Sequence, residues 1–452
     1  MSDNSSTAFT HGVVDFVSAL DADELSAAVR HECVRGFVNA VGCMVGGGRH
    51  KIVDTAHAAL LEFSGPATAS LLGRGEKTDP LHAALLNGTA SAAYSYFDTY
   101  SSAFVHPAGP VAAGLLALTE RAPVPGKQFL SAYAAGVEVA CRLTKALAVP
   151  PAEGEMAWSM SGITCGPATA LAVGKLLGVD AKQLNWALGI AASQAAGTRV
   201  AIGSMAGSLI FGQAAQTGLR SALLAAKGFT STDGALEDRN GFAKVFARKA
   251  NLNALIEGAG RDFELMLNTY KPYPCDVVIH PAIDAMLRLR RERNLSDSTQ
   301  IDRVALKVSE SAISFAHRRD PKNDLEAKFS LHHWVAAAAA RGKAGLAEGR
   351  LAVVNDPEIQ RLRLAIDIQG DPSLAYDAAE LIVRLKSEEQ LSRRVEHCVG
   401  SLKSPLSDAE LDTKFIDQVE MTIGSERARD LLSNCWNLEA LPDVAVIARK
   451  GC

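Results

Sequence analysis

The sequence has no long apolar run and few aromatic residues. Of its 452 residues only 6% are aromatic and 21% are charged, whereas 48% are hydrophobic, and several long stretches are rich in Ala, Gly and Leu. No apolar run approaches the ~20 residues that a membrane-spanning helix needs. This composition is typical of close-packed helices with small residues at their contacts, and the length is typical of two domains.

The chain also lacks an excess of charge of one sign. Its 46 basic and 50 acidic residues give a formal net charge of −4, so there is no basic footprint for nucleic acid. Its 8 cysteines form no CxxC pair, which is typical of reduced thiols in the cytoplasm. The first residues, MSDNSSTAFTHG, lack the basic start and apolar core of a signal peptide. We therefore expect a soluble cytoplasmic protein without nucleic-acid or membrane partners.

Hydrophobic periodicity divides the chain into helical and strand-rich parts. Apolar residues recur at helical spacing in segments 23–44, 80–93, 111–120, 127–147, 166–177, 181–196 and 207–226. Later, alternation of apolar and polar residues predicts strands over 301–308, 362–368 and 381–385, the last followed by a polar turn at 386–389 and a further strand. From Ser407 the pattern is helical again.

These patterns predict a mainly α fold with two domains. We expect a large all-helical domain at 1–267, a smaller α+β lid domain at 268–400, and a segment at 401–452 that returns to the helical domain.

The junction of the two predicted domains carries an unusual segment, YKPYPCDVVIHPAIDA at 270–285. The KPYP sequence at 271–274 cannot continue a helix, because its prolines lack N–H donors and push the preceding residues out of the α region. His280 follows, next to a helical run at 282–291. A histidine that a rigid segment brings to a domain junction is a candidate for chemistry. The alternative is a structural hinge whose histidine caps the helix or packs.

A second polar stretch, YSYFDTYSSAFVHP at 94–107, holds Asp98, Thr99 and His106. A carboxylate and a histidine brought together can act as acid and base, with the carboxylate orienting the imidazole. The alternative is a loop in which Asp98 caps a turn and His106 is solvated.

These stretches and others resemble the signature of the MmgE/PrpD family, which includes 2-methylcitrate dehydratase, cis-aconitate decarboxylase and iminodisuccinate epimerase. In the family's order the stretches are NGTA at 87–90, DT at 98–99, HP at 106–107, TCGP at 164–167, GQAAQTG at 212–218, YKPYPC and IHPAIDA within 270–285, EAKFS at 326–330, LSRRVEH at 391–397 and SPLSDAELDTKF at 404–415. The resemblance implies a helical domain and a smaller α+β domain, an active site in the cleft between them, a homodimer, and carboxylic acid metabolism without metal or cofactor.

The resemblance also implies site residues. His106 matches a general acid/base histidine, and Asp98 and Thr99 match the end of a DFDD(T/S) motif. The expected catalytic residues are His106, Asp98, His280 and Lys271. The expected substrate-binding residues are Thr99, His333, Ser95, Met160, Gly207 and Tyr273.

Several positions depart from the family's pattern. Ser95 stands in place of an aspartate, Ala92, Met160 and Ile210 in place of histidines, Gly207 in place of a lysine, and His333 in place of a tyrosine. Lysine and histidine neutralise carboxylates and move protons in a tricarboxylate site, so their loss predicts a wider, less positive and more apolar pocket.

We therefore expect a cofactor-independent lyase or isomerase, of the dehydratase, decarboxylase or epimerase type. It would abstract a proton next to a carboxylate, on a substrate less anionic or bulkier than methylcitrate. The alternative is a non-catalytic ligand-binding or regulatory paralogue of the family.

Overall fold

The structure, a computed structural model, describes residues 8–148, 157–316 and 318–452. Residues 1–7 lie outside the described residues, and they include the start of MSDNSSTAFTHG, the sequence considered for a signal peptide. The chain forms two compact units. Unit 1 comprises the chain up to Ala93, Phe97–Asn268 and Asp408–Cys452, and unit 2 comprises Tyr94–Tyr96 and Thr269–Ser407.

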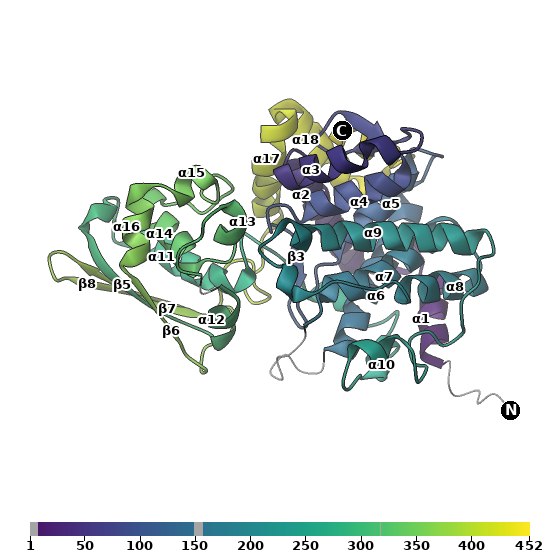
Figure 1. Cartoon of the computed structure of the whole chain (residues 1–452), viewed down its shortest axis with the longest axis horizontal. Coiled ribbons are helices and arrows are strands. Elements are labelled where there is room, and N and C mark those ends of the chain that lie inside the picture. Colours follow the sequence, from purple (N-terminus) through teal and green to yellow (C-terminus); the bar gives the residue numbers. More distant parts are fainter. Residues whose placement is uncertain (1–7, 149–156, 317) are drawn as a thin grey trace. The chain divides into compact units, whose positions relative to one another are not determined.

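The described part of unit 1 is built mainly from helices, with short strands (Figure 1). Its helices are α1 (Ala8–Ala19), α2 (Ala27–Gly47), α3 (Lys51–Leu60), α4 (Pro80–Ser91), α5 (Ala108–Thr119), α6 (Gly126–Leu147), α7 (Met160–Leu176), α8 (Ala181–Ala192), α9 (Met205–Ala226), α10 (Phe242–Phe246), α17 (Asp408–Ile423), α18 (Ser425–Trp436) and α19 (Ala445–Gly451). Strands β1 (Ala69–Leu71) and β2 (Glu76–Thr78) form an antiparallel pair, and β3 (Asp98–Tyr100) precedes α5.

Local chemistry explains where these helices begin. Asp79 caps α4 by accepting hydrogen bonds from the backbone N–H groups of Leu81 and His82, and Pro80 fills the first helical position, where no donor is needed. Asp180 and Gln183 form a capping box at the start of α8.

Small residues set the helix contacts of unit 1, as the composition predicted. A Cβ atom added to Gly212 of α9 would lie 2.1 Å from the carbonyl oxygen of Leu85 in α4. A Cβ atom added to Gly88 of α4 would lie 2.9 Å from the Cα atom of Gly212. The two helices therefore cross backbone against backbone, which only glycine permits at these points.

Unit 2 is a four-stranded sheet with helices (Figure 1). The strand order is β6-β5-β7-β8, with β5 parallel to β6 and antiparallel to β7, and β7 antiparallel to β8. The strands are β5 (Ile301–Val308), β6 (Ile366–Gly370), β7 (Ala379–Leu385) and β8 (Gln390–Val395), and β4 (Asn268–Tyr270) leads into the unit. The helices are α11 (His280–Glu292), α12 (Glu310–Ala316), α13 (Asp324–Ala327), α14 (Leu331–Arg341), α15 (Leu351–Val354) and α16 (Pro357–Leu364).

The fold class is mainly α with a smaller α+β unit, as predicted. Helix α11 packs on β7 and β8, and α14 packs between α11 and α16. The strand predicted over 362–368 is wrong in its first half. Asp356 accepts hydrogen bonds from Glu358 and Ile359, and with Pro357 at the first position this cap starts α16, which continues to Leu364 before β6 begins.

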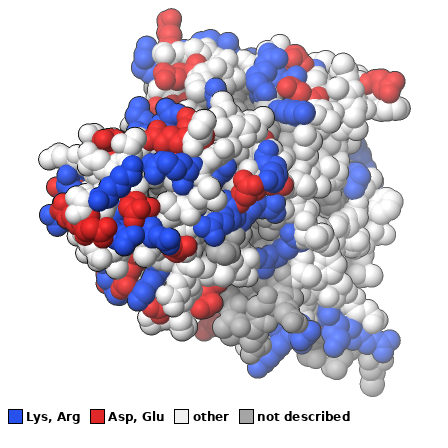
Figure 2. All heavy atoms as spheres, turned by 60° about the vertical axis from the view of Figure 1, so that its left-hand side comes forward, with Lys and Arg blue, Asp and Glu red and all other residues white. Residues whose placement is uncertain are grey.

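Charges are interspersed on the surface. Figure 2 shows basic and acidic side chains alternating over much of the face drawn. Several pair across neighbouring strands of unit 2, such as Arg384 with Asp302 and Arg394 with Glu380. None of the helices described is long and apolar enough to cross a membrane. The cysteines, all of which fall within the described ranges, are free thiols.

Candidate active site

In unit 1 the imidazole of His106 is held by the backbone of β3. Its Nδ1 atom lies 2.8 Å from the carbonyl oxygen of Asp98 and 3.2 Å from Oγ1 of Thr99. A carbonyl oxygen only accepts hydrogen bonds, so Nδ1 carries the proton that is donated to it. In the neutral ring the lone pair is therefore on Nε2, which is the arrangement a general base needs.

Aromatic residues fix the plane of the His106 ring. The ring centroid lies 4.3 Å from that of Phe97 and 5.9 Å from that of Phe211, and the imidazole is nearly parallel to the Phe211 ring, at 14°. The backbone N–H of His106 donates to Oγ of Ser161 in the first turn of α7, at 3.1 Å. The histidine is thus positioned by β3, α7 and α9 together.

The carboxylate of Asp98 does not orient His106, so that part of the sequence interpretation is wrong. Its Oδ2 atom accepts hydrogen bonds from Nδ2 of Asn268, at 2.8 Å, and from the backbone N–H of Ala108, at 3.2 Å. The second bond caps the start of α5, where a carboxylate is favoured. Asp98 therefore holds His106 through its carbonyl group and anchors α5 through its side chain.

Burial decides the ionisation of Asp98. The residue is 0% exposed, and Oδ1 has no hydrogen-bond partner among the described residues. Burial raises the pKa of this carboxyl from 3.8 to about 6, although the hydrogen bonds from Asn268 and Ala108 and the charge of Lys414 favour the ionised form. Lys414 is itself buried in α17, where its Nζ donates to Oδ1 of Asn39 at 2.6 Å.

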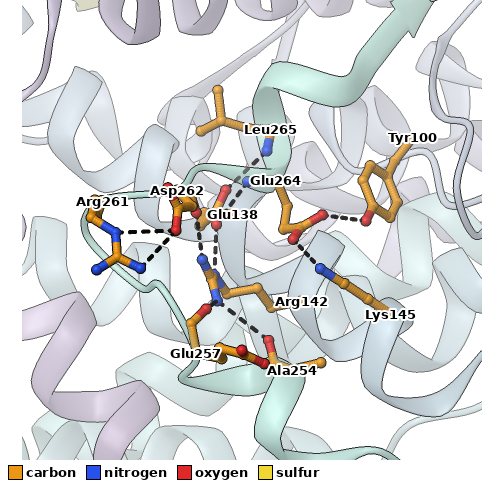
Figure 3. A network of polar contacts seen from close by, with 10 residues as sticks. All are labelled: Tyr100, Glu138, Arg142, Lys145, Ala254, Glu257, Arg261, Asp262, Glu264 and Leu265. Atoms are coloured by element: carbon orange, nitrogen blue, oxygen red, sulfur yellow. Dashed lines mark hydrogen bonds and ion pairs between the residues drawn. The ribbon is translucent and has the colours of Figure 1, made fainter.

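A buried polar network holds residues 254–265 against helix α6 (Figure 3). Glu138 and Arg142 of α6 form an ion pair at 2.6 Å, and both are almost fully buried. Glu138 accepts from the backbone of Glu264 and Leu265, while Arg142 donates to carbonyl groups at 254, 257 and 262. Glu264 then accepts a hydrogen bond from the hydroxyl of Tyr100, the last residue of β3. Through this bond α6 fixes the strand that holds His106.

Two of the positions that depart from the family pattern, Ala92 and Ile210, belong to an apolar wall in unit 1. Ala92 and Phe97 form a buried cluster with Phe211, and Ile210 packs against it. The imidazole of His106 contacts Phe97 and Phe211 of this wall, and the wall includes two positions at which the family pattern has histidines.

Met160 and Gly207 lie at the starts of two helices. Met160 is the buried first residue of α7, directly before Ser161, which binds the backbone of His106. Gly207 is in the first turn of α9, where an added Cβ atom would lie 2.8 Å from the carbonyl oxygen of Ala201. Any larger side chain there, including a lysine, requires the backbone at 201 to move.

In unit 2 the KPYP segment is irregular, as predicted, and its lysine is buried. Lys271 is 4% exposed, and its Nζ donates to the carbonyl oxygen of Cys275, at 3.1 Å, and to Oγ of Ser95, at 3.4 Å. The hydroxyl of Tyr96 donates to the carbonyl oxygen of Pro272, at 2.9 Å. Ser95 therefore contacts Lys271 with a neutral hydroxyl, whereas an aspartate there would bring a counter-charge.

Two further predicted site residues of unit 2 contact each other. The rings of Tyr273 and His280 meet edge to face, with their centroids 5.4 Å apart. His280 is buried as the first residue of α11, and burial raises the pKa of the Tyr273 hydroxyl above its usual range. Tyr273 and His280 thus form one aromatic pair at the start of α11.

His333 is a buried neutral histidine in the first turn of α14. Its Nε2 donates to the carbonyl oxygen of Glu348, at 2.9 Å, and its Nδ1 has no hydrogen-bond partner among the described residues. Burial lowers the pKa of His333 to about 4. Its acceptor nitrogen can bind a donor but is a poor base near neutral pH.

Each unit thus assembles its own part of the predicted site. His106, Asp98 and Thr99 meet in unit 1, and Lys271 contacts Ser95 in unit 2. Sequence reasoning missed Lys328, which is buried in unit 2, and Lys414. Both lie in family-like stretches, EAKFS and SPLSDAELDTKF, but a lysine is by default assigned to the surface.

Comparison with known proteins covers almost the whole chain. Residues 12–255 match the model of the MmgE/PrpD N-terminal domain and residues 273–438 that of the MmgE/PrpD C-terminal domain. The cis-aconitate decarboxylase of Homo sapiens is 23% identical over 97% of this chain and 93% of its own length. That of Mus musculus is 24% identical over 97% and 92%, and that of Aspergillus terreus is 23% identical over 98% and 95%. With both of its domain models matched in order, the chain belongs to the MmgE/PrpD family.

Proposed function

We propose that the protein is a cofactor-independent lyase or isomerase that abstracts a proton from a carbon next to a carboxylate. The observation that carries the proposal is the hydrogen bond from Nδ1 of His106 to the carbonyl oxygen of Asp98. This bond fixes the tautomer, so that Nε2 of His106 is the basic atom. The names of the three relatives given above, cis-aconitate decarboxylases, favour a lyase.

The proposed first step transfers the carbon-bound proton to Nε2 of His106. The electron pair left behind spreads onto the carboxylate, which then carries a second negative charge and needs a cation. Lys271 is our candidate for that cation, because it is buried and its contact at position 95 is a hydroxyl.

The fate of the electron pair decides the type of reaction. Loss of a substituent from the neighbouring carbon forms a C=C bond, which is a lyase reaction. Return of a proton to the opposite face is an epimerisation. The imidazolium form of His106 can also donate its proton to a carbon from which CO₂ has departed, which completes a decarboxylation.

The apolar wall beside His106 supports a substrate that is less anionic or bulkier than methylcitrate. Ala92, Phe97, Ile210 and Phe211 offer no charge to a carboxylate, and desolvating a carboxylate against them is costly. They suit an alkyl or aryl group attached near the reacting carbon.

The test is a turnover assay on mono-, di- and tricarboxylates, with products followed by proton NMR. His106→Ala should lower turnover by ~10²–10⁴-fold, the usual contribution of a general base. His11→Ala, which changes an exposed histidine of the same unit, is the matched control. Equal turnover by wild type and His106→Ala removes His106 from the mechanism, and binding without turnover by the wild type favours the non-catalytic alternative.

We also propose a cytoplasmic setting and a homodimer. The free thiols support the first, and the family resemblance implies the second. Size-exclusion chromatography with light scattering tests the dimer directly.

A further inference from the structure

Tyr100, the last residue of β3, ties together the two segments that position His106. Its backbone N–H donates to the carbonyl oxygen of Val105, the residue directly before His106, at 2.8 Å. Two residues before Tyr100 in the same strand, the carbonyl oxygen of Asp98 accepts from Nδ1 of His106. The place of Tyr100 therefore sets both where the backbone enters His106 and where the acceptor of its ring proton lies.

The loop that Tyr100 closes has a conformation that needs such support. Phe104 has a φ of 54°, in the left-handed region that residues other than glycine rarely adopt. A conformation of this kind persists where surrounding contacts hold it. Here the carbonyl oxygen of Tyr100 accepts from the N–H of Phe104 at 2.9 Å, and the bond from Tyr100 to Val105 closes the loop. A shift of Tyr100 is therefore passed on to His106.

The hydroxyl of Tyr100 is fixed in turn by Glu264. The tyrosine is 0% exposed, and its hydroxyl donates to Oε2 of Glu264 at 2.5 Å. Burial and this hydrogen bond raise the pKa of the hydroxyl above its usual range, so the phenol keeps its proton and remains the donor. Oε1 of Glu264 forms an ion pair with Lys145 of α6, and the backbone N–H of Glu264 donates to the buried carboxylate of Glu138 (Figure 3). Glu264 thus offers Tyr100 an acceptor that is held at its backbone and at its side chain.

We propose that Tyr100 and Glu264 are positioning residues for His106, and that the hydrogen bond between them sets the rate of proton transfer rather than the binding of substrate. The inference rests on the proposed function and deepens it. Neither residue belongs to the family-like stretches given above, and neither has to touch the substrate, because both act through the backbone at 98–106. A displacement of about 1 Å between reacting groups can cost about 10²-fold in rate, so this bond matters to catalysis.

The first experiment removes the hydroxyl and keeps the ring. With the carboxylate that the wild type converts fastest in the turnover assay, Tyr100→Phe should lower kcat by about 10–10²-fold and leave KM nearly unchanged. Tyr133→Phe is the matched control, because Tyr133 is also buried in unit 1 and its hydroxyl has no hydrogen-bond partner among the described residues. The control should leave kcat unchanged.

Variants of Glu264 test whether the two residues act as one unit. Glu264→Gln retains an oxygen that accepts from the Tyr100 hydroxyl and should keep most of the activity, whereas Glu264→Leu should be as slow as Tyr100→Phe. The double variant Tyr100→Phe/Glu264→Leu should be no slower than either single variant, because both changes remove the same bond. Losses that multiply in the double variant would contradict the proposed unit.

A second readout needs no substrate. Nitrogen-15 chemical shifts of histidine-labelled protein distinguish protonated from unprotonated ring nitrogens, and the signals missing from His106→Ala identify His106. In the ligand-free wild type, Nδ1 should be protonated and Nε2 should not. Tyr100→Phe should populate the other tautomer as well, because the carbonyl oxygen of Asp98 is no longer held in place. A tyrosine needed only for folding would lower stability to urea and leave the tautomer and kcat of the folded protein unchanged.

The outcomes separate this inference from the proposed function. If Tyr100→Phe has the wild-type tautomer and the wild-type kcat, the inference is wrong, while the proposed function stands provided that His106→Ala lowers turnover. If the wild type converts none of the carboxylates, the proposed function fails. The tautomer then decides alone: a mixed tautomer in Tyr100→Phe supports the positioning role, and a wild-type tautomer overturns it.

Discussion

Replacing Asp98 by Asn separates two roles for this residue. If the carboxylate is a buried anchor of α5, its ionisation costs stability and hardly touches catalysis. Because burial raises its pKa from 3.8 to about 6, the folded protein binds this proton more tightly than the unfolded chain does. The stabilisation of the folded state by the protonated Asp98 carboxyl is therefore fully present below pH 3.8 and is lost as pH rises through 6. A shift of about two pKa units corresponds to about 3 kcal/mol.

The assay is urea unfolding of the wild type and Asp98→Asn between pH 4 and pH 8. The wild type should lose about 3 kcal/mol relative to the variant across this range, because the amide has no charge to bury. Turnover by Asp98→Asn should fall by far less than turnover by His106→Ala, since the carbonyl group that holds Nδ1 remains. Parallel stability curves, or a loss of turnover as large as that of His106→Ala, would refute the assignment of the carboxylate as an anchor.

Three further predictions concern other residues and the substrate. Burial lowers the pKa of His333 from 6.5 to about 4, so the stabilisation from the neutral ring is present above pH 6.5 and is lost as pH falls through 4. In the same unfolding assay the wild type should lose about 3 kcal/mol of unfolding free energy relative to His333→Gln over that window. Activity on 2-methylcitrate and cis-aconitate should be weak, and turnover of either at ~1–10³ per second would contradict the argument from lost charges. His280 should lie within ~10 Å of His106 in a ligand-bound crystal structure, and imidazoles that open onto different surfaces would end the hypothesis of a shared substrate.

Several helices of unit 1 were predictable from apolar spacing, and α4 and α8 begin at the expected residues, Pro80 and Ala181. Helices α1, α3 and α10 were not among the predicted segments. The strand predicted over 362–368 failed in its first half because Asp356-Pro357 starts a helix, and a short apolar run does not distinguish helix from strand.

The HP and DT stretches led us to expect His106 near Asp98 and Thr99, and the structure brings these residues together. The contact itself was not predictable, because which group of Asp98 meets the imidazole depends on how β3 enters α5. The burial of Lys328 could not be identified from spacing, because it arises where two segments far apart in sequence meet: the N–H of Asp276 donates to the carbonyl oxygen of Lys328. Tertiary packing, rather than local pattern, decides such desolvation.

The most direct test of proton abstraction by His106 is solvent exchange at the substrate carbon. In D₂O, with a carboxylate that the wild type turns over or binds, proton NMR should show deuterium entering at the carbon next to the carboxylate. His106→Ala should slow that exchange by ~10²–10⁴-fold while still binding the ligand. Exchange by His106→Ala as fast as by the wild type would contradict the account.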